Sequence, residues 1–422
     1  MKEEYLHYLW QLKRLPFNKM KLVDGRPITI KNTGWLNYDA GPDFFNGKIE
    51  IDGLDWSGNI EFHVKSSDWF THGHQHDDKY NNVILHVVYK HDRDVFIDEK
   101  PIPTLQLKEF IDYKHLDRFN QLLKTHQRIP CATSFPSENI NVEHQITIAL
   151  FQRMQRKAQR LEQVLGRDKE NRKKALLISV IQSFGGRANK LSFLELANIL
   201  PIDIIAKESW NQTRIESIIF GCSGMLNDSC EDLYYEQLQN EWTLLKSKHQ
   251  LQEMSCASWS FGGVRPSSFP TMRLAQLSAF LSSWDIAIDI NDSATLILEK
   301  FLNHFNNPPN EYWRTHVRFN KTSKSHQSIM SKKAQSLVVI NGLVSYLIYV
   351  NQLTDRYDLI DKAQNILESL PPEQNYIVKA WRKLGVKPKN AGESQGLIEL
   401  KNEFCNFRRC LSCKIGHVVM DY

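Results

Sequence analysis

The stretch from Gly41 to Lys65 concentrates side chains that bind metal ions and move protons. Hard divalent cations prefer carboxylate oxygens, and Mg²⁺ takes one or two carboxylates while water and phosphate complete its shell. Asp43 and Glu61 are the carboxylates that fit this role. A neighbouring His63 or Lys65 would orient an attacking water or offset phosphate charge. We therefore expect a Mg²⁺ or Mn²⁺ site with these four residues as its catalytic candidates.

Strand alternation is what would bring these side chains together. Successive residues of a strand point to opposite sides. Strands over 48–52 and 59–65 would then form a hairpin with an apolar side and a polar side, the latter carrying Glu61, His63 and Lys65. The Gly- and Asp-rich segment 53–58 predicts the turn between them. An ordinary solvated hairpin face would have the same pattern, and this alternative stays open.

Histidines crowd the residues that follow the hairpin. Six of the fifteen lie between residues 63 and 91. His72 and His74 belong to a polar, glycine-containing loop, whereas His86 interrupts the apolar strand predicted over 83–89. If that strand pairs near the hairpin, His86 and His63 approach each other, and neutral imidazoles would favour Zn²⁺, Mn²⁺ or Fe over Mg²⁺. A hydrogen-bonded core histidine and a solvated loop are the alternatives.

Cysteines crowd the C-terminal end. Cys405, Cys410 and Cys413 lie within the last eighteen residues. A Cys-x₂-Cys pair is half of a common zinc site, and structural zinc takes four ligands, so His417 or Cys131 would supply the fourth. Four thiolates would also hold an iron–sulfur cluster. Zinc, an iron–sulfur cluster and three reduced thiols in a packed turn are the possibilities that the spacing leaves open.

A basic helix face is the main indication of a nucleic-acid partner. Apolar residues recur at steps of three and four over 141–165, which predicts an amphipathic helix. Arg153, Arg156, Lys157 and Arg160 mark its polar side and would contact a phosphate backbone. A solvated helix face has the same appearance, and the net charge of +5 is only mildly basic. The protein partner, if any, is unknown.

The elements that must position these residues follow two patterns along the chain. After a helix at 3–14, short β segments predominate between 21 and 108, and helical periodicity follows Pro130. We expect an α+β domain over 1–115, a helical domain over 116–390, and a terminal helix with a cysteine-rich tail over 391–422. Further apolar-periodic segments are predicted at about 175–184, 190–199, 214–226, 272–282, 293–304, 335–352, 358–368 and 394–404.

Several function classes lack their sequence signatures. There is no Walker motif and no Gly-x-Gly-x-x-Gly after a strand, so ATP-driven and dinucleotide chemistry are unsupported. Ser223 does not lie in a Gly-x-Ser-x-Gly elbow. No run of about 18 apolar residues predicts a membrane span, and the charged N-terminus lacks the apolar core of a signal peptide. We expect a cytoplasmic protein.

The hairpin motif resembles a known nuclease superfamily. Pro42-Asp43 followed by Glu61-Phe-His63 is similar to the PD-(D/E)XK pattern, which implies a restriction-endonuclease-like mixed sheet with flanking helices. In that superfamily the Asp and the Glu bind the metal, and a Lys assists the nucleophilic water. Here His63 stands in the lysine position, and Lys65 lies one same-face step further. Tyr80 resembles the helix tyrosine behind the active site of some of these nucleases.

A wider set of motifs resembles an uncharacterised bacterial family, domain-of-unknown-function family 2851, which has no established activity. The expected function is a metal-dependent phosphodiesterase acting on DNA or RNA. The alternatives are a non-catalytic nucleic-acid-binding or scaffold protein on a decayed nuclease fold, and a non-nucleolytic metalloenzyme centred on the histidines. The motifs that carry the resemblance are Gly41-Pro-Asp-Phe, Gly58-Asn-Ile-Glu-Phe-His63, Ser67-Asp-Trp69, His72-Gly-His74, Tyr80, Asn82-Val-Ile-Leu-His-Val-Val88, Arg265-Pro266, Phe269-Pro270, Ser394-Gln395 and the C-terminal cysteines.

Overall fold

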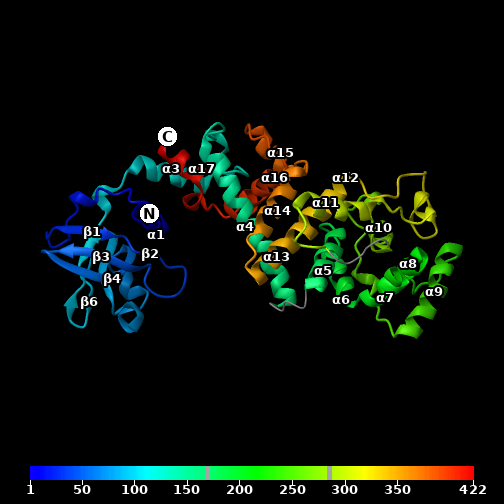
Figure 1. Ribbon diagram of the computed structural model, residues 1–422. Helices are drawn as coiled ribbons and strands as arrows, with labels where there is room; N and C mark the ends of the chain where they lie inside the picture. The colour runs from blue at the N-terminus through cyan, green and yellow to red at the C-terminus, as the bar shows by residue number, and fades with distance from the viewer. Residues whose placement is uncertain (167–171, 283–287) are drawn as a thin grey trace. The chain divides into compact units, whose positions relative to one another are not determined.

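The chain forms two compact units in the computed structural model, which describes residues 1–166, 172–282 and 288–422 (Figure 1). The N-terminal unit comprises Met1–Gln145 together with Lys401–Tyr422, and the helical unit comprises Ile146–Leu400. The boundaries expected from the sequence were at 115 and 390. The contacts instead divide the chain after Gln145 and after Leu400, and they join the C-terminal tail to the N-terminal unit.

A mixed β-sheet is the centre of the N-terminal unit, as the sequence predicted for an α+β fold. The strand order is β1-β3-β4-β5-β8, with β2 also paired to β3. The pairs among β1, β2, β3 and β4 are antiparallel, whereas β4–β5 and β5–β8 are parallel. The strands are β1 (Ile28–Asn32), β2 (Trp35–Leu36), β3 (Phe44–Ile51), β4 (Leu54–Lys65), β5 (Val83–Lys90) and β8 (Thr104–Gln106), with a separate pair β6 (Phe96–Ile97) and β7 (Lys100–Pro101).

The β3–β4 hairpin turns earlier than the sequence analysis predicted. Its loop is Asp52-Gly53, and both residues have positive φ (52° and 74°), as a two-residue type I′ turn requires. The predicted turn over 53–58 is therefore wrong, because Leu54–Gly58 already belong to β4. A bulge between Phe44 and Gly47 then shifts the pairing by one residue, so that Phe44 pairs with Ile60. The bulge brings Asp43 beside Glu61.

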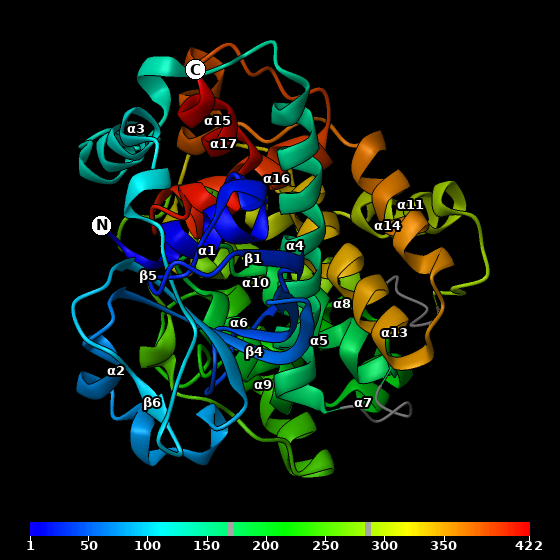
Figure 2. The same cartoon turned by 90° about the vertical axis from the view of Figure 1, so that its left-hand side faces the viewer.

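Helices from both ends of the sequence pack on the N-terminal unit. Figure 2 shows α1 beside the sheet, where it contacts β4. The C-terminal helix α17 lies beside α3 (Figure 1), and both α3 and α17 were missed in the sequence. The helices of this unit are α1 (Glu3–Gln11), α2 (Asp68–Thr71), α3 (Tyr113–Lys124) and α17 (Lys414–Asp421).

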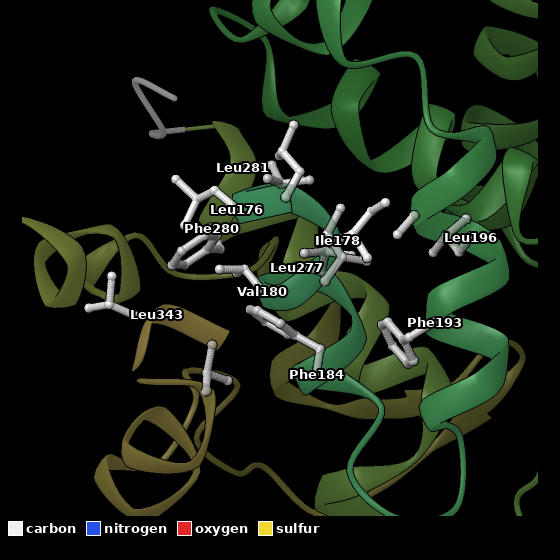
Figure 3. Close-up of a cluster of buried hydrophobic side chains, with 14 of the residues drawn as sticks. Leu176, Ile178, Val180, Phe184, Phe193, Leu196, Leu277, Phe280, Leu281 and Leu343 are labelled. Carbon is white, nitrogen blue, oxygen red and sulfur yellow. The ribbon is translucent and has the colours of Figure 1, made fainter. Parts of the chain in front are cut away.

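The helical unit packs around an extensive apolar core. Figure 3 shows Val180 and Phe184 of α5 with Leu277 and Phe280 of α10, and the rings of Phe184 and Phe280 lie 5.6 Å apart. Its elements are α4 (Ile140–Leu165), α5 (Arg172–Phe184), α6 (Lys190–Ile199), α7 (Ile202–Glu208), α8 (Gln212–Cys222), α9 (Leu233–His249), α10 (Pro270–Ser282), α11 (Ala294–Asn303), β9 (His316–Arg318), β10 (Lys321–Thr322), α12 (Lys332–Val338), α13 (Val344–Thr354), α14 (Asp358–Ser369), α15 (Tyr376–Lys383) and α16 (Ala391–Glu399).

The apolar segment predicted over 335–352 is a single helical run interrupted by a π-helical turn. This turn, Val339–Leu343, joins α12 to α13. Gly342 lies against Val180 of α5, where an added Cβ would come within 3.0 Å of the Val180 Cα. By length and composition the run Lys332–Thr354 is able to cross a membrane, yet 67% of its most apolar window is buried inside the protein. A buried core helix has these same properties, so the absence of a membrane span stays a prediction.

Candidate metal centre

Glu61 and His63 are buried, although the sequence analysis placed them on a possible solvated face. Their side chains are 4% and 0% exposed. β4 has hydrogen-bonded neighbours on both sides, and the α2 segment packs against it. The parallel register of β4 and β5 places Glu61 opposite His86. Carboxyl and imidazole groups are costly to bury without partners, so we expect polar groups or an ion to lie beside these two side chains.

Three imidazoles converge beside Glu61. Ligand atoms of His63, His72 and His74 all lie within 4.8 Å of one another. Glu61 Oε1 lies 3.2 Å from His74 Nε2 and 3.8 Å from His63 Nε2. Three histidine nitrogens form a donor set typical of Zn²⁺, Fe²⁺ or Mn²⁺ sites, and Glu61 Oε1 approaches two of them. His74 Nε2 is buried and has no hydrogen-bond partner, as expected for an atom that faces a cation.

The two predicted carboxylates lie next to each other. The Asp43 backbone N–H donates to Glu61 Oε2 at 3.1 Å, and the Phe62 N–H donates to Asp43 Oδ2 at 2.9 Å. These bonds fix both side chains to the start of β3 and the middle of β4. Asp43, Glu61 and His63 therefore share one site, as the sequence analysis required.

His86 approaches His63, as expected if β5 pairs near the hairpin. Its Nε2 lies 2.9 Å from His63 Nδ1, and His63 Nε2 lies 3.1 Å from His72 Nδ1. Burial, and then His86 and the loop histidines, lower the pKa of His63 to about 2. Burial and then His74 lower the pKa of His86 to about 3. Both imidazoles are thus neutral at pH 7, the state in which histidine binds metal. A neutral His63 that bound a metal through Nε2 would donate its Nδ1–H to His86, which would fix the ring orientation.

The carboxylates are held in an environment that disfavours negative charge. Burial, and then the charge of Asp43, raise the pKa of Glu61 to about 9. The same two causes raise the pKa of Glu3 to about 7. A bound cation would reverse this balance and favour the ionised carboxylates, so metal binding would release protons near neutral pH.

A second group of ligand atoms, from Glu3, His7 and Asp43, was missed in the sequence. These atoms also lie within 4.8 Å of one another, and His7 Nε2 is 3.2 Å from Asp43 Oδ2. The His7 ring meets the rings of Phe44 and Phe62 edge-on. A signal was present, because residues four apart share one side of a helix and Glu3 and His7 have that spacing in α1. The sequence analysis used only the apolar side of that helix, so Glu3 and His7 were not assigned to the site.

A comparison with protein-family models identifies the family of this chain. The model of the family described as Protein of unknown function (DUF2851) matches residues 3–376. The chain belongs to this family. No curated protein and no solved structure matches it. The match ends before Ser394-Gln395 and the C-terminal cysteines, which the sequence analysis had included in the resemblance.

Several residues that carry the family resemblance surround the histidines of the candidate metal centre. The Tyr80 ring stacks on His74 with ring centres 3.8 Å apart, and Trp69 meets His63, His74 and His86 edge-on. Tyr80 ends a 3₁₀ turn rather than lying on the expected helix. Burial, followed by Glu61, raises the pKa of Tyr80 to about 12. These two rings pack against the histidines, and His72 is the exposed member of the three.

Lys65 lies away from the group formed by the other catalytic candidates. It is exposed at the end of β4, where its charge helps to lower the pKa of Asp92. His63 is completely buried, so it is not placed to act as a solvent-exposed base. The structure therefore brings together three of the four predicted catalytic residues, with histidines in place of the lysine.

The C-terminal thiols belong to the same unit as Cys131. All four are free cysteines; Cys131, Cys405 and Cys410 are buried, and Cys413 is half-buried. Burial raises the pKa of Cys405, and the neighbouring thiols of Cys131, Cys413 and Cys410 raise it further. Cys413 precedes α17, and backbone hydrogen bonds from Gly416 and Ile415 partly oppose the effect of burial on its thiol pKa. His417 Nε2 instead lies 2.6 Å from the Leu411 carbonyl oxygen.

The predicted basic face of α4 is largely engaged within the helical unit. Arg153 and Arg156 form ion pairs with the buried Glu399. Lys157 Nζ donates to Gln395 Oε1 at 2.9 Å and to Asn341 Oδ1 at 3.0 Å. These three residues are consequently part of an internal polar network, whereas Arg160 is exposed.

Proposed function

We propose that this protein is a metal-dependent phosphodiesterase that acts on nucleic acid. The observation that carries the proposal is the convergence of His63, His72 and His74 beside the buried Glu61, which in turn contacts the half-buried Asp43. A PD-(D/E)XK-like arrangement, with Asp43 and Glu61 at adjacent strands, supports phosphodiester hydrolysis as the reaction. DNA and RNA are both substrates of this chemistry.

Some residues of the candidate site would bind the cation, and others would orient the groups around it. His63, His72, His74 and Glu61 would hold the ion, and Asp43 would complete or support its shell. A bound divalent cation lowers the pKa of water and polarises a phosphoryl oxygen. Asp43 Oδ2 is fixed by the Phe62 N–H, so the second oxygen of this carboxylate would accept a proton from an attacking water. His86 is a positioning residue, because it acts through the His63 ring.

The donor set selects among divalent cations. Imidazole nitrogens favour Zn²⁺, Fe²⁺ and Mn²⁺, whereas Mg²⁺ takes oxygen ligands almost exclusively. Of the two cations expected from the sequence, Mn²⁺ therefore fits these side chains better than Mg²⁺. We propose Mn²⁺, Fe²⁺ or Zn²⁺ as the working ion.

The direct test is cleavage by purified full-length protein. Labelled single-stranded DNA, duplex DNA and RNA would each be incubated with Mn²⁺, Fe²⁺, Zn²⁺ or Mg²⁺. We expect cleavage that Glu61→Gln and His72→Ala each reduce by about 100-fold or more, since ligand loss has effects of this order. His76→Ala is the matched control, because His76 is exposed in the same 3₁₀ turn as His74. Cleavage that survives both ligand variants would contradict the assignment.

The burial of His63 favours a second candidate, a histidine metal centre without nuclease activity. A ligand set with His63 and Glu61 buried and His72 exposed suits a structural ion, or a small substrate that reaches the ion beside His72. This candidate predicts stoichiometric metal that is lost in His63→Ala and His72→Ala proteins but no cleavage of any nucleic acid. Nucleic-acid binding without turnover, retained in the Asp43→Ala and Glu61→Ala variants, would instead select a non-catalytic binding or scaffold protein.

We propose a separate structural metal at the C-terminal thiols. Cys131, Cys405, Cys410 and Cys413 would supply the four sulfur ligands that zinc or an iron–sulfur cluster requires. Their sulfur atoms do not form a group within 4.8 Å in the described residues, so they would have to close on the ion as it binds. The amide hydrogen bonds at Cys413 would stabilise a ligated thiolate, since they already favour the charged form of this sulfur. His417 supports neither metal through its Nε2, which faces a carbonyl oxygen.

A further inference from the structure

The helical unit contains a cavity of about 900 Å³ with a strongly cationic lining. It lies among α4, α5, α6, the loop at 263–268, α10 and the π-helical turn. Its described lining residues include eight arginines or lysines and no aspartate or glutamate. Three of the eight, Arg153, Arg156 and Lys157, belong to the Glu399 network. Outside that network the lining cations are Arg160, Arg187, Lys190, Arg265 and Arg273.

Arg273 is the clearest sign that this lining is built for an anion. Its guanidinium donates to Ser268 Oγ at 3.1 Å and to Gln276 Oε1 at 2.9 Å, and both acceptors are neutral. No carboxylate in the described residues pairs with it. Burial lowers the pKa of Arg273 to about 10. Arg273 is half-buried, and a partly desolvated cation without an opposite charge is unfavourable, so an anionic ligand would reduce that penalty.

Cations from two helices crowd together at another side of the cavity. Burial, and then the charges of Arg160 and Arg153, lower the pKa of Lys190. Lys157 is affected in the same direction by burial, Arg153 and Lys190. Like charges at this spacing repel one another. Glu373 and Glu399 partly offset this effect at Lys157, whereas Arg160 and Lys190 are exposed at the cavity with no carboxylate among its described lining residues. Several negative charges of a ligand would favour this grouping.

The size and composition of the cavity narrow the class of anion. A volume near 900 Å³ is at the upper end for small-molecule sites, and five cations exceed what one phosphate needs. Phe184 is the one aromatic residue of the described lining, and it is only 2% exposed in the core (Figure 3). Stacking on aromatic rings, the usual way to hold bases, is thus absent from this lining. Recognition would depend on phosphates.

We propose that this cavity binds consecutive phosphate groups of a nucleotide ligand through Arg273, Lys190, Arg187 and Arg265. A nucleic-acid strand and a free nucleoside triphosphate present the same phosphate chemistry. The proposal does not depend on the metal centre or on phosphodiesterase activity, since all of its residues lie in the helical unit.

Fluorescence anisotropy with full-length protein tests this proposal. The probes are a fluorescein-labelled oligo-dT of twelve nucleotides and a fluorescent ATP analogue, both in EDTA so that no turnover occurs. We expect Arg273→Gln to weaken binding by about tenfold, and Lys190→Gln to lower the slope of log K against log salt by about 1 for the oligonucleotide. Arg187→Gln is a further variant for the case that Arg273→Gln does not fold, because Arg187 is exposed.

The controls separate this site from other basic surfaces and from the metal centre. Arg382→Gln removes one exposed positive charge elsewhere in the helical unit and should leave binding unchanged. Glu61→Gln should also leave binding unchanged, even if it abolishes cleavage. Binding of the oligonucleotide alone would assign the cavity to a strand, and competition by unlabelled ATP would assign it to a free nucleotide. The proposal is overturned if neither probe binds at low salt, or if the cavity variants bind as the parent protein does.

Discussion

Glu216 shows how one buried titratable side chain couples folding to pH in the helical unit. It lies on α8 with no exposed surface, and Trp313 Nε1 donates a hydrogen bond to its Oε1. Burial raises the pKa of Glu216 to about 7. The ordinary value of 4.5 applies to the unfolded chain. Between these two values the unfolded carboxyl is ionised while the folded one stays protonated, so stability falls as the pH rises.

We predict that Glu216→Gln removes this pH dependence. The stability of the parent protein should fall between pH 4.5 and pH 7, by on the order of 3 kcal/mol from this group, at 1.36 kcal/mol per pKa unit. The stability of the Glu216→Gln protein should not fall in this way. Its free energy of unfolding, relative to that of the parent protein, therefore increases with pH. Urea unfolding followed by tryptophan fluorescence at several pH values measures both proteins. Glu311→Gln, at an exposed site, is the control, and a pH-independent difference between Glu216→Gln and the parent would contradict the prediction.

At the residue scale, side-chain chemistry was easier to predict from the sequence than burial. Strand alternation grouped Glu61 with His63, and His86, which interrupts an apolar strand, lies beside His63 as a buried, hydrogen-bonded histidine. Burial of that face depends on α1 and on the segment after β4, which no local pattern relates to the hairpin. The same long-range packing brings Glu3 and His7 to Asp43, so periodicity could not predict these two residues of the candidate site.

At the scale of elements, one glycine allows α8 and α9 to approach closely. A Cβ added to Gly221 would lie 2.0 Å from Cδ2 of Trp242. The indole is rigid and only 3% exposed, so it has little space in which to move. In an isolated helix, alanine is better than glycine by about 1 kcal/mol. Here the steric conflict opposes that propensity.

We predict that Gly221→Ala destabilises the helical unit by about 1–3 kcal/mol, the usual range for overpacking. Gly262→Ala is the matched control, because no atom lies within 4 Å of its added Cβ. Thermal unfolding of the two variants and the parent protein measures the difference. An unchanged or raised melting temperature for Gly221→Ala would show that the two helices separate without penalty.

The sequence predicted strongly periodic elements better than short ones. The helix predicted over 141–165 and the five main strands have their counterparts in α4, β1, β3, β4, β5 and β8. α17 was missed because eight residues form a stable helix only through tertiary packing, which it obtains on α3. The Asp52-Gly53 turn was recognisable from its dipeptide, but the polar segment up to Gly58 seemed to be a longer loop.

At the scale of the whole molecule, the two ends of the chain meet in one unit. Arg14 forms an ion pair with Asp421, and Arg118 donates to the Met420 carbonyl oxygen at 3.0 Å. Ile415 and Met420 are fully buried there. Contacts between residues about 300 to 400 positions apart leave no local signal, so the sequence predicted the tail as a separate segment. The return of the tail also explains how Cys131 becomes a neighbour of cysteines near the C-terminus.

If a metal binds the four thiols, the attachment of the C-terminal tail depends on their sulfur atoms. We predict that removing a thiol changes both the metal content and the hydrogen exchange of this unit. Cys410→Ser and Cys413→Ser should each lower the zinc or iron bound per chain, because a four-ligand site rarely survives the loss of one thiolate. Elemental analysis of protein purified without added metal measures the content. Cys256→Ser is the matched control, since Cys256 is an exposed thiol of the helical unit.

In the Cys410→Ser and Cys413→Ser variants, hydrogen exchange should accelerate in α3 and α17, which pack on each other, while α5 and α10 keep their protection. Unchanged metal content and exchange in both variants would mean that burial of Ile415 and Met420, together with the contacts of Arg14 and Arg118, holds the tail without a metal.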